Sequence, residues 1–323
     1  MQSIDSLSLI VPAYNEAGTI GLSLERCIEA IRASQLNCQL IVVDDGSADD
    51  TTAIANEVLK DKFANGNYQV LRYEVNRGKG YAIRQGLPLC AGEYVIIHDA
   101  DLEYDPNDIF RMLSYAREAD LPVLYGSRYL YSVSHRKGRF PTSFYLGGQL
   151  VTKVTNLLYG QRLTDEPTCY KLFKRELLLS FDLECEGFEF CPEVTAKAAL
   201  RGIKIKEIPI SYFPRSVDEG KKISWCYGWS FLLLLISLVA SLPVMIKHKR
   251  WGRLGQVAMA FVLPLLLYGL LLYHINYSWD SIDNVIAYSA KRYLFCFVPI
   301  ALFCTFTLDA FYLAFRKVES WLS

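Results

Sequence analysis

The sequence predicts an α/β fold with a mainly parallel sheet, followed by segments that meet a membrane. Short β-branched or apolar runs alternate with amphipathic stretches of helix length, which is typical of βαβ units. The runs lie at residues 7–11, 40–43, 69–73, 94–97 and 122–125. Charged residues are dense up to about Lys222 and then fall into a few clusters between long apolar runs. The 323 residues are therefore enough for one soluble α/β domain and a membrane-attached appendage.

A distinctive polar loop follows each of the first four predicted strands. The loops read Pro-Ala-Tyr-Asn-Glu at 12–16, Asp-Asp-Gly-Ser at 44–47, Asn-Arg-Gly-Lys-Gly at 76–80 and Asp-Ala-Asp at 99–101. One acidic loop alone is usually a helix cap or a solvated turn. Three acidic loops at successive strand ends instead predict a ligand site, because such sheets bind ligands beyond the carboxyl ends of their strands.

Composition narrows the class of protein. The formal net charge is zero, which argues against a nucleic-acid partner, since such a protein needs a basic excess. The nine cysteines form no C-x-x-C pair or zinc-like spacing, so a reduced compartment is the simpler interpretation. The first eight residues resemble no cleaved signal, and we expect the soluble domain to face the cytoplasm.

The pair Asp99 and Asp101 predicts a metal site. Alternate residues of an extended segment project to the same side, so the two carboxylates can bind one hard cation, Mg²⁺ or Mn²⁺. The same alternation turns His98 to the other face, and we expect a packed histidine there.

The glycine-containing turn at 76–80 opens a predicted helix, with the cations of Arg77 and Lys79 near the helix start. Phosphate is the expected guest of such a turn. A dinucleotide fingerprint would need a glycine where Ile83 stands and would normally follow the first strand, so a dehydrogenase is excluded.

Together with Gly-Ser-Arg-Tyr at 126–129 and Asp-Glu-Pro-Thr-Cys-Tyr-Lys-Leu-Phe at 165–173, these motifs resemble glycosyltransferase family 2. The similarity runs in order from about residue 7 to 225 and points to the dolichyl-phosphate mannose synthase-like branch. It implies a Rossmann-like GT-A glycosyltransferase domain. The donor would be a nucleotide-diphosphate sugar of the GDP-mannose or UDP-glucose type, and the acceptor a polyprenyl (dolichyl or undecaprenyl) phosphate.

The resemblance also implies roles for individual residues. The metal would lie on Asp99, Asp101 and Glu103, and Arg128 would face the phosphates at the reaction centre. The implied donor-binding residues are Pro12, Tyr14, Glu16, Val43, Asp45, Lys79, Asp99, Ala100, Asp101, Arg128, Arg215 and Lys221.

Arg215 and Lys221 belong to a stretch that resembles the family's mobile loop, which closes over the donor. The usual serine and lysine at its end are replaced by Lys221 and Lys222, which leaves the closing lysine open. A basic patch against anionic lipid is a compatible further role for this stretch.

Asp165 is the family's candidate acid near the acceptor, and a loop carboxylate satisfied by backbone amides is the equal alternative. A lipid phosphate is already anionic, so a strong general base is optional. One of the cations Arg136, Lys137 and Arg139 is a candidate for the acceptor phosphate, with a lipid-facing charge run as the alternative. Glu189 and Glu193 are expected to brace the site without taking part in the chemistry.

Beyond the catalytic domain, expected at residues 1–224, the sequence predicts membrane attachment. Residues 254–279 and 293–308 contain no Asp, Glu, Lys or Arg and predict a hairpin of two spans within 254–323. Residues 225–253 are expected to be interfacial, because a span there would put the cluster at Lys247 to Arg253 on the far side of the bilayer. A third span remains the competing topology.

The sequence thus predicts an inverting, metal-dependent glycosyltransferase of the membrane. Two rivals are a processive polysaccharide synthase, whose Gln/Arg-x-x-Arg-Trp motif is missing, and a membrane-tethered nucleotide-sugar binding protein without activity. The sugar, the lipid length and the oligomeric state, including a homo-oligomer, stay open.

Overall fold

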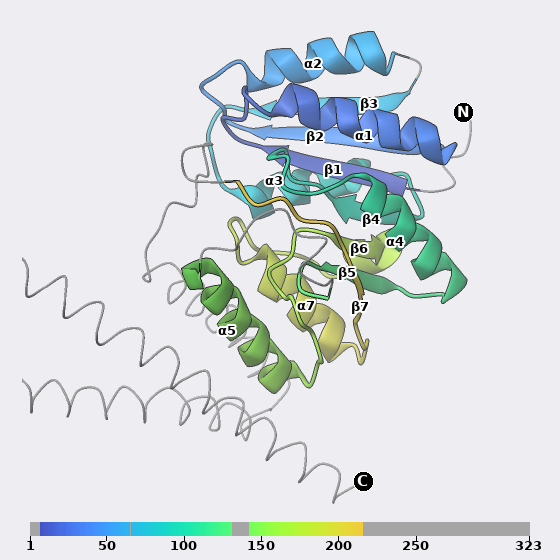
Figure 1. The fold of residues 1–323 in the computed structure, drawn as a ribbon. Helices are drawn as coiled ribbons and strands as arrows, with labels where there is room; N and C mark the ends of the chain where they lie inside the picture. Colours follow the sequence, from blue (N-terminus) through green and yellow to red (C-terminus); the bar gives the residue numbers. More distant parts are fainter. Residues whose placement is uncertain (1–6, 65, 131–141, 216–323) are drawn as a thin grey trace, which may run out of the picture.

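A seven-stranded sheet forms the centre of the part of the chain that the computed structural model describes, residues 7–64, 66–130 and 142–215. The strand order is β3-β2-β1-β4-β6-β5-β7, with helices on both faces (Figure 1). The strands are β1 (Leu7–Ala13), β2 (Cys38–Asp45), β3 (Asn67–Tyr73), β4 (Tyr94–Ile97), β5 (Val123–Ser127), β6 (Lys171–Lys174) and β7 (Lys206–Pro209). The helices are α1 (Ile20–Ser34), α2 (Thr51–Lys62), α3 (Lys79–Gly86), η1 (Leu87–Leu89), α4 (Asn107–Glu118), α5 (Thr142–Tyr159), α6 (Arg175–Leu179) and α7 (Phe190–Leu200).

The strands are parallel except where β6 pairs with β4 and β5. The predicted α/β class with a mainly parallel sheet is therefore confirmed. The five predicted strands correspond to β1 to β5, with ends that differ by up to two residues.

The central strands are apolar because helices cover both of their faces. Every residue of β2 and β4 is buried, and side chains such as Ile10, Ile41 and Val43 are completely enclosed. Continuous apolar runs, and not alternation, are typical of parallel strands covered on both sides. β3 lies at the edge of the sheet and carries only exposed or half-buried residues.

β6 is a strand that the sequence did not predict. Phe173 pairs with Val95 of β4 on one side and with Val123 of β5 on the other, so β6 joins two strands that are otherwise separate. The loop before β6 consequently runs between the ends of β4 and β5, where the Gly126 amide donates to the Tyr170 carbonyl at 2.8 Å.

The helices α5 and α7 form a smaller apolar cluster beside the sheet. Val154 and Leu158 of α5 pack with Ala196 and Ala199 of α7. This cluster fixes α5 near the carboxyl ends of the strands.

The predicted membrane segments at 225–253 and 254–323, the cluster at Arg136 to Arg139 and Lys221 lie outside the described residues. In the ranges that the structure covers, no helix is both long and apolar enough to cross a membrane.

Candidate active site

The loops after β1 and β2 are joined by hydrogen bonds. The Asn15 amide donates to the Ser47 hydroxyl at 2.8 Å, and the Ala48 amide donates to the Asn15 side-chain oxygen at 2.8 Å. The Glu16 amide donates to the Thr51 hydroxyl at 2.8 Å. The two predicted loops therefore form one rim at the carboxyl ends of the strands.

The predicted nucleotide-binding residues are unequally accessible. Tyr14 is 42% exposed, and Pro12 and Glu16 are half-buried. Val43 is completely buried, facing α3 at Gly86, so its side chain is not available to a ligand. A nucleotide would therefore meet the β1 loop and, at Val43, only the backbone.

Asp45 holds the glycine turn. Its carboxylate accepts the Arg77 amide at 3.1 Å and the Gly78 amide at 2.5 Å. Gly78 has φ +109°, and a Cβ atom there would lie 2.5 Å from the Glu186 carbonyl oxygen. Only glycine is compatible with that approach.

Backbone amides of this turn and of the start of α3 are bound within the protein. At the start of α3 the Gly80 amide donates to the Gly187 carbonyl at 3.1 Å, and the Tyr81 amide donates to the Glu186 carbonyl at 2.9 Å. Together with the Arg77 and Gly78 amides on Asp45, four backbone amides between residues 77 and 81 are engaged within the protein. The side chain of Lys79 extends from this turn to the acidic loop after β4.

Lys79 turns to the predicted metal pair. Its ammonium nitrogen lies 2.5 Å from Asp99 Oδ1 and 3.7 Å from the Cys169 sulfur. Burial disfavours the charged ammonium, but the Asp99 carboxylate outweighs it and raises the pKa of Lys79 well above its usual range. Burial likewise opposes the charge of Asp99, and the lysine outweighs it and lowers the pKa of Asp99. Both groups are therefore charged.

Asp101 lies in a more acidic environment. Burial, together with the negative charges of Asp99 and Glu103, raises its pKa to about 7. Arg215 is a neighbouring cation, with a guanidinium nitrogen 3.6 Å from Asp101 Oδ2. Ala100 between the two aspartates is buried. Two crowded carboxylates offering only oxygen atoms fit a hard divalent cation, which would relieve their repulsion.

Glu103, the third predicted ligand, faces the end of the described chain. One carboxylate oxygen accepts the Arg215 amide at 3.0 Å, and the other accepts the Tyr212 hydroxyl. Across the described ranges, no three His, Cys, Asp or Glu side chains converge as a metal site. Glu103 thus ties the segment that carries Arg215 to the acidic loop.

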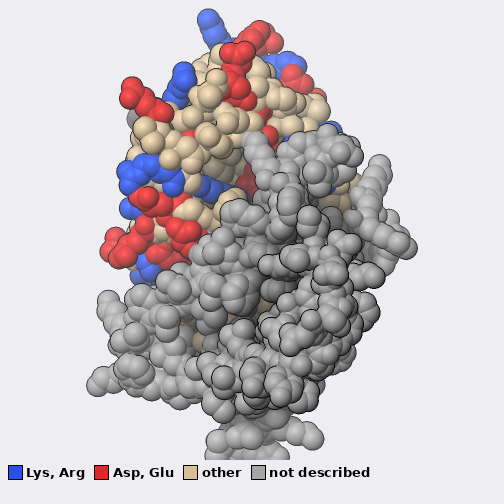
Figure 2. Space-filling view, turned by 90° about the vertical axis from the view of Figure 1, so that its left-hand side faces the viewer, with Lys and Arg blue, Asp and Glu red and all other residues tan. Residues whose placement is uncertain are grey.

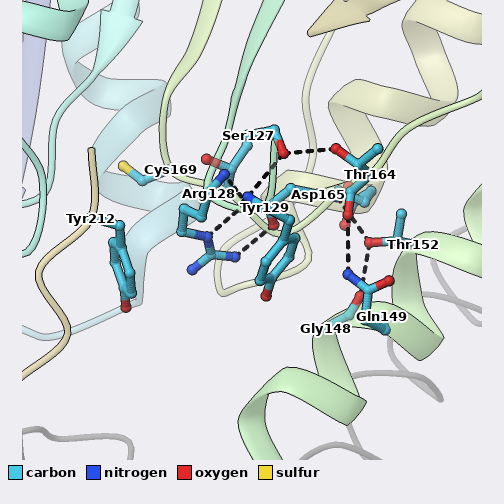
Figure 3. A network of polar contacts seen from close by, with 12 residues as sticks. Ser127, Arg128, Tyr129, Gly148, Gln149, Thr152, Thr164, Asp165, Cys169 and Tyr212 are labelled. Carbon is cyan, nitrogen blue, oxygen red and sulfur yellow. Dashed lines mark hydrogen bonds and ion pairs between the residues drawn. The ribbon is translucent and has the colours of Figure 1, made fainter. Parts of the chain in front are cut away.

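Arg128 and Asp165 form a closed pair beside this loop. Asp165 Oδ2 accepts the Arg128 amide at 2.9 Å and its Nε at 2.7 Å, while Oδ1 accepts Nη2 at 2.7 Å (Figure 3). Asp165 is completely buried, and the Arg128 side chain is 13% exposed. The guanidinium also lies 5.2 Å from the ring of Tyr212 and 5.6 Å from that of Tyr129. Its orientation is therefore set on three sides.

The contacts confirm that His98 is packed and satisfied, and that Glu189 and Glu193 brace a loop. His98 is 1% exposed and lies between the Ser23 hydroxyl at 3.2 Å and the Tyr170 hydroxyl at 2.9 Å. Glu189 accepts the amides of residues 186 and 187, and Glu193 accepts those of residues 184 and 185. These two glutamates brace the loop that contacts α3.

Sequence reasoning missed Glu207, Tyr212 and Cys169 as site residues. Glu207 lies in a short strand, and its partners are 42 and 43 positions away in the chain. Neither spacing nor composition signals such a contact.

Figure 2, which faces the carboxyl ends of the strands, shows basic and acidic side chains next to one another on the described part of this face.

Comparisons with known proteins agree with this geometry. Residues 8–180 match the family described as glycosyl transferase family 2. A low-salt glycan biosynthesis hexosyltransferase of Haloferax volcanii is 30% identical over 72% of this chain and 53% of its own length. The dolichyl-phosphate beta-glucosyltransferase of Saccharomyces cerevisiae is 28% identical over 67% of this chain and 68% of its own. The dodecaprenyl-phosphate galacturonate synthase of Rhizobium johnstonii is 26% identical over 83% of this chain and 76% of its own. The chain thus spans about half the length of the first of these relatives.

Among solved structures, glucosyl-3-phosphoglycerate synthase from Mycobacterium tuberculosis is similar with a TM-score of 0.51. It is 20% identical, over 73% of this chain and 80% of the other, and this likeness concerns the fold alone. The sheet, the ordered motifs at its carboxyl edge and the family match agree that this chain belongs to glycosyl transferase family 2, with an α/β GT-A fold.

Proposed function

We propose that this protein transfers a hexose from a nucleotide-diphosphate sugar to the phosphate of a polyprenyl lipid, with a divalent metal. The observation that carries the proposal is the acidic pair Asp99 and Asp101 at the carboxyl edge of the sheet, with Lys79 and Arg215 beside it. Two carboxylates with flanking cations suit a diphosphate that arrives with a metal ion. The names of the yeast and Rhizobium relatives support a polyprenyl phosphate acceptor.

Asp99 and Asp101 would hold Mg²⁺ or Mn²⁺, which supplies positive charge to the leaving diphosphate. Glu103 was expected as a third ligand, but both of its oxygens already accept hydrogen bonds from Tyr212 and Arg215. We therefore assign it to the support of the Arg215 segment.

Transfer would proceed by one displacement with inversion. An oxygen of the acceptor phosphate forms a bond to the anomeric carbon while the bond from that carbon to the donor diphosphate breaks and its electron pair leaves with the diphosphate. Arg128 and Arg215 would stabilise the charge that grows on the leaving group. The acceptor loses no proton, so Asp165 serves better as the fixed partner of Arg128 than as a base.

Arg215 is suited to a clamp because its guanidinium is not fully engaged. Its Nε is buried and has no hydrogen-bond partner among the described residues. A phosphate oxygen would satisfy that donor, since an unpaired buried donor is costly. Lys221 would act with it from outside the described residues.

At the other end of the donor, Pro12, Tyr14 and Glu16 would contact the base and ribose. The exposed ring of Tyr14 is the accessible surface for a base. Val43 and Asp45 would act through the backbone and through the glycine turn.

The same proposal includes a catalytic domain of residues 1–224 on the cytoplasmic side, an interfacial segment at 225–253 and a membrane hairpin at 254–323. It rests on the apolar runs and the basic cluster of the sequence.

Single cysteines near Lys249 and near Ser320 should react with an impermeant thiol reagent from the catalytic side only. Labelling of the two positions from opposite sides would establish three spans.

A donor screen tests the function. The full chain in detergent micelles with Mn²⁺ is offered radiolabelled UDP-glucose, GDP-mannose or UDP-N-acetylglucosamine with undecaprenyl or dolichyl phosphate. We expect a chloroform-soluble labelled product with one donor. A long water-soluble polymer would identify a polysaccharide synthase, and donor binding without turnover would identify a binding protein.

A further inference from the structure

The carboxylate of Glu207 in β7 binds the turn at Thr164 and Asp165, which lies outside any helix or strand. Glu207 Oε2 accepts the Thr164 amide at 2.6 Å and its hydroxyl at 3.0 Å, and Oε1 accepts the Asp165 amide at 3.0 Å. Both backbone donors at the tip of the turn therefore bind one side chain from a distant strand. Glu207 pairs with Tyr125 in the β5–β7 register, so it stands three residues before Arg128 on the neighbouring strand.

This turn determines where the carboxylate of Asp165 lies. With the Asp165 amide held by Glu207, the side chain leaves the backbone toward the end of β5 and meets Arg128 through three hydrogen bonds (Figure 3). A displacement of the turn would move the Asp165 carboxylate and, with it, the guanidinium. The contacts thus form one line from Glu207 through Asp165 to Arg128.

Apart from the ion pair of Asp165 with Arg128, two further hydrogen bonds reach the turn at Thr164, and both are weaker than those to Glu207. The Ser127 and Thr164 hydroxyls lie 2.7 Å apart, and the Gln149 amide group donates to the Thr164 carbonyl at 3.1 Å. Both are neutral hydrogen bonds, whereas those of Glu207 are accepted by a carboxylate, which makes them about twice as strong. Burial of Glu207 raises its pKa, and the donors of the turn oppose that shift.

We propose that Glu207 is a positioning residue for sugar transfer, which fixes the turn at Thr164 and Asp165 so that Asp165 holds Arg128 at the reaction centre. This inference rests on the proposed function for the role of Arg128. A carboxylate is required at this position, because each of its oxygens accepts a hydrogen bond from one of two adjacent amides. In Glu207→Gln one of those amides would face an NH₂ group.

The first test measures the turn itself and needs no substrate. In the full chain in micelles, hydrogen exchange of a peptide that covers residues 160–168 should be at least ~10-fold faster in Glu207→Gln than in the parent protein. The control Lys206→Gln changes an exposed side chain in the same strand and should leave the exchange unchanged. Unchanged exchange in Glu207→Gln would overturn the inference at its first step.

The second test is a double-mutant cycle with turnover as the readout, using the donor that the screen identifies. We expect kcat to fall at least ~10-fold in Glu207→Gln, with the donor KM within ~3-fold and partial recovery in Glu207→Asp. Because Glu207 acts through Asp165, Glu207→Gln added to Asp165→Asn should lower kcat by no more than ~3-fold beyond Asp165→Asn alone.

The outcomes separate the two proposals. If Asp165→Asn lowers kcat but Glu207→Gln does not, or if the two losses multiply in full, Glu207 does not act through Asp165 and the inference fails. If neither Asp165→Asn nor Arg128→Lys lowers kcat, the proposed function is wrong at this pair. The exchange experiment still reports on the turn in that case.

Discussion

Lys79 Nζ lies 2.5 Å from Asp99 Oδ1, so the helix after β3 is tied by charge to the end of β4. The pair brings together two motifs that are 20 positions apart in the chain. A lysine in this place balances part of the negative charge of the acidic loop, and under the proposed function it would do so before a metal or a diphosphate binds.

Replacing Lys79 with Gln should destabilise the protein and make the metal more stabilising. Asp99 would be left without its cation at low exposure, at a cost of about 2 kcal/mol, less than for a fully buried pair. Thermal unfolding with and without Mn²⁺ measures this. The increase in Tm on adding Mn²⁺ should be larger in Lys79→Gln than in the parent and in the surface control Lys62→Gln. An equal increase in all three would contradict a role for Lys79 at the metal pair.

Removing either carboxylate of the metal pair should abolish most of the activity. Asp99→Asn and Asp101→Asn are expected to lower kcat by at least ~10²-fold, because metal charge supplies several kcal/mol of transition-state stabilisation. EDTA should do the same to the parent enzyme, with recovery on adding Mn²⁺ or Mg²⁺. The exposed Asp120→Asn is the matched control. Near-normal turnover of both variants, with circular dichroism that shows them folded, would remove the metal assignment.

Arg215→Ala should affect turnover more than membrane attachment. The guanidinium faces Asp101, and a clamp gains strength as charge develops on the diphosphate, whereas a lipid contact adds only about 1 kcal/mol per cation. Activity in micelles without anionic lipid and binding to anionic vesicles are measured for Arg215→Ala and for the surface control Arg117→Ala. Normal activity of Arg215→Ala with weakened vesicle binding would make the residue a lipid anchor.

His98→Gln should lower the free energy of unfolding by about 1–2 kcal/mol and leave the half-saturating Mn²⁺ concentration unchanged. The ring lies between the hydroxyls of Ser23 and Tyr170, which occupy both of its nitrogens, and its loss disturbs buried hydrogen bonds. Urea unfolding and a Mn²⁺ titration of turnover give the two quantities. A tenfold rise in the half-saturating concentration would identify His98 as a ligand.

The sequence predicted the sheet well where strands are continuous apolar runs, as in β4, whose bounds match the prediction. The sequence did not predict β6, because this strand has only four residues and begins and ends with lysine. It is a strand because it pairs with β4 on one side and β5 on the other. Local patterns carry no information about such pairing.

The sequence predicted only part of the site, because local patterns do not report contacts between distant segments. The apolar run of β4 correctly predicted that Asp99 and Asp101 follow the end of a strand, but residues 100 and 101 lie in a turn and not in the extended segment that the alternation assumed. The partners of Asp45 and Glu103 depend on loops that arrive from 32 to 112 positions away. The glycine turn is visible in the sequence, whereas the carbonyls of residues 186 and 187, which accept the Gly80 and Tyr81 amides, belong to a distant loop that no local pattern indicates.

The insertion of β6 between β4 and β5 has a consequence for synthesis on the ribosome. When β4 emerges, Tyr94 to Ile97 present an apolar edge whose partner strand begins only at Lys171. At a translation rate of 5–20 residues per second, this edge stays unpaired for roughly 4–15 s before β6 is synthesised. During that time it is an open template for pairing with another nascent chain. Stalling or truncation between β5 and β6 should therefore yield aggregates, and a chaperone that covers β4 would be needed most in that interval.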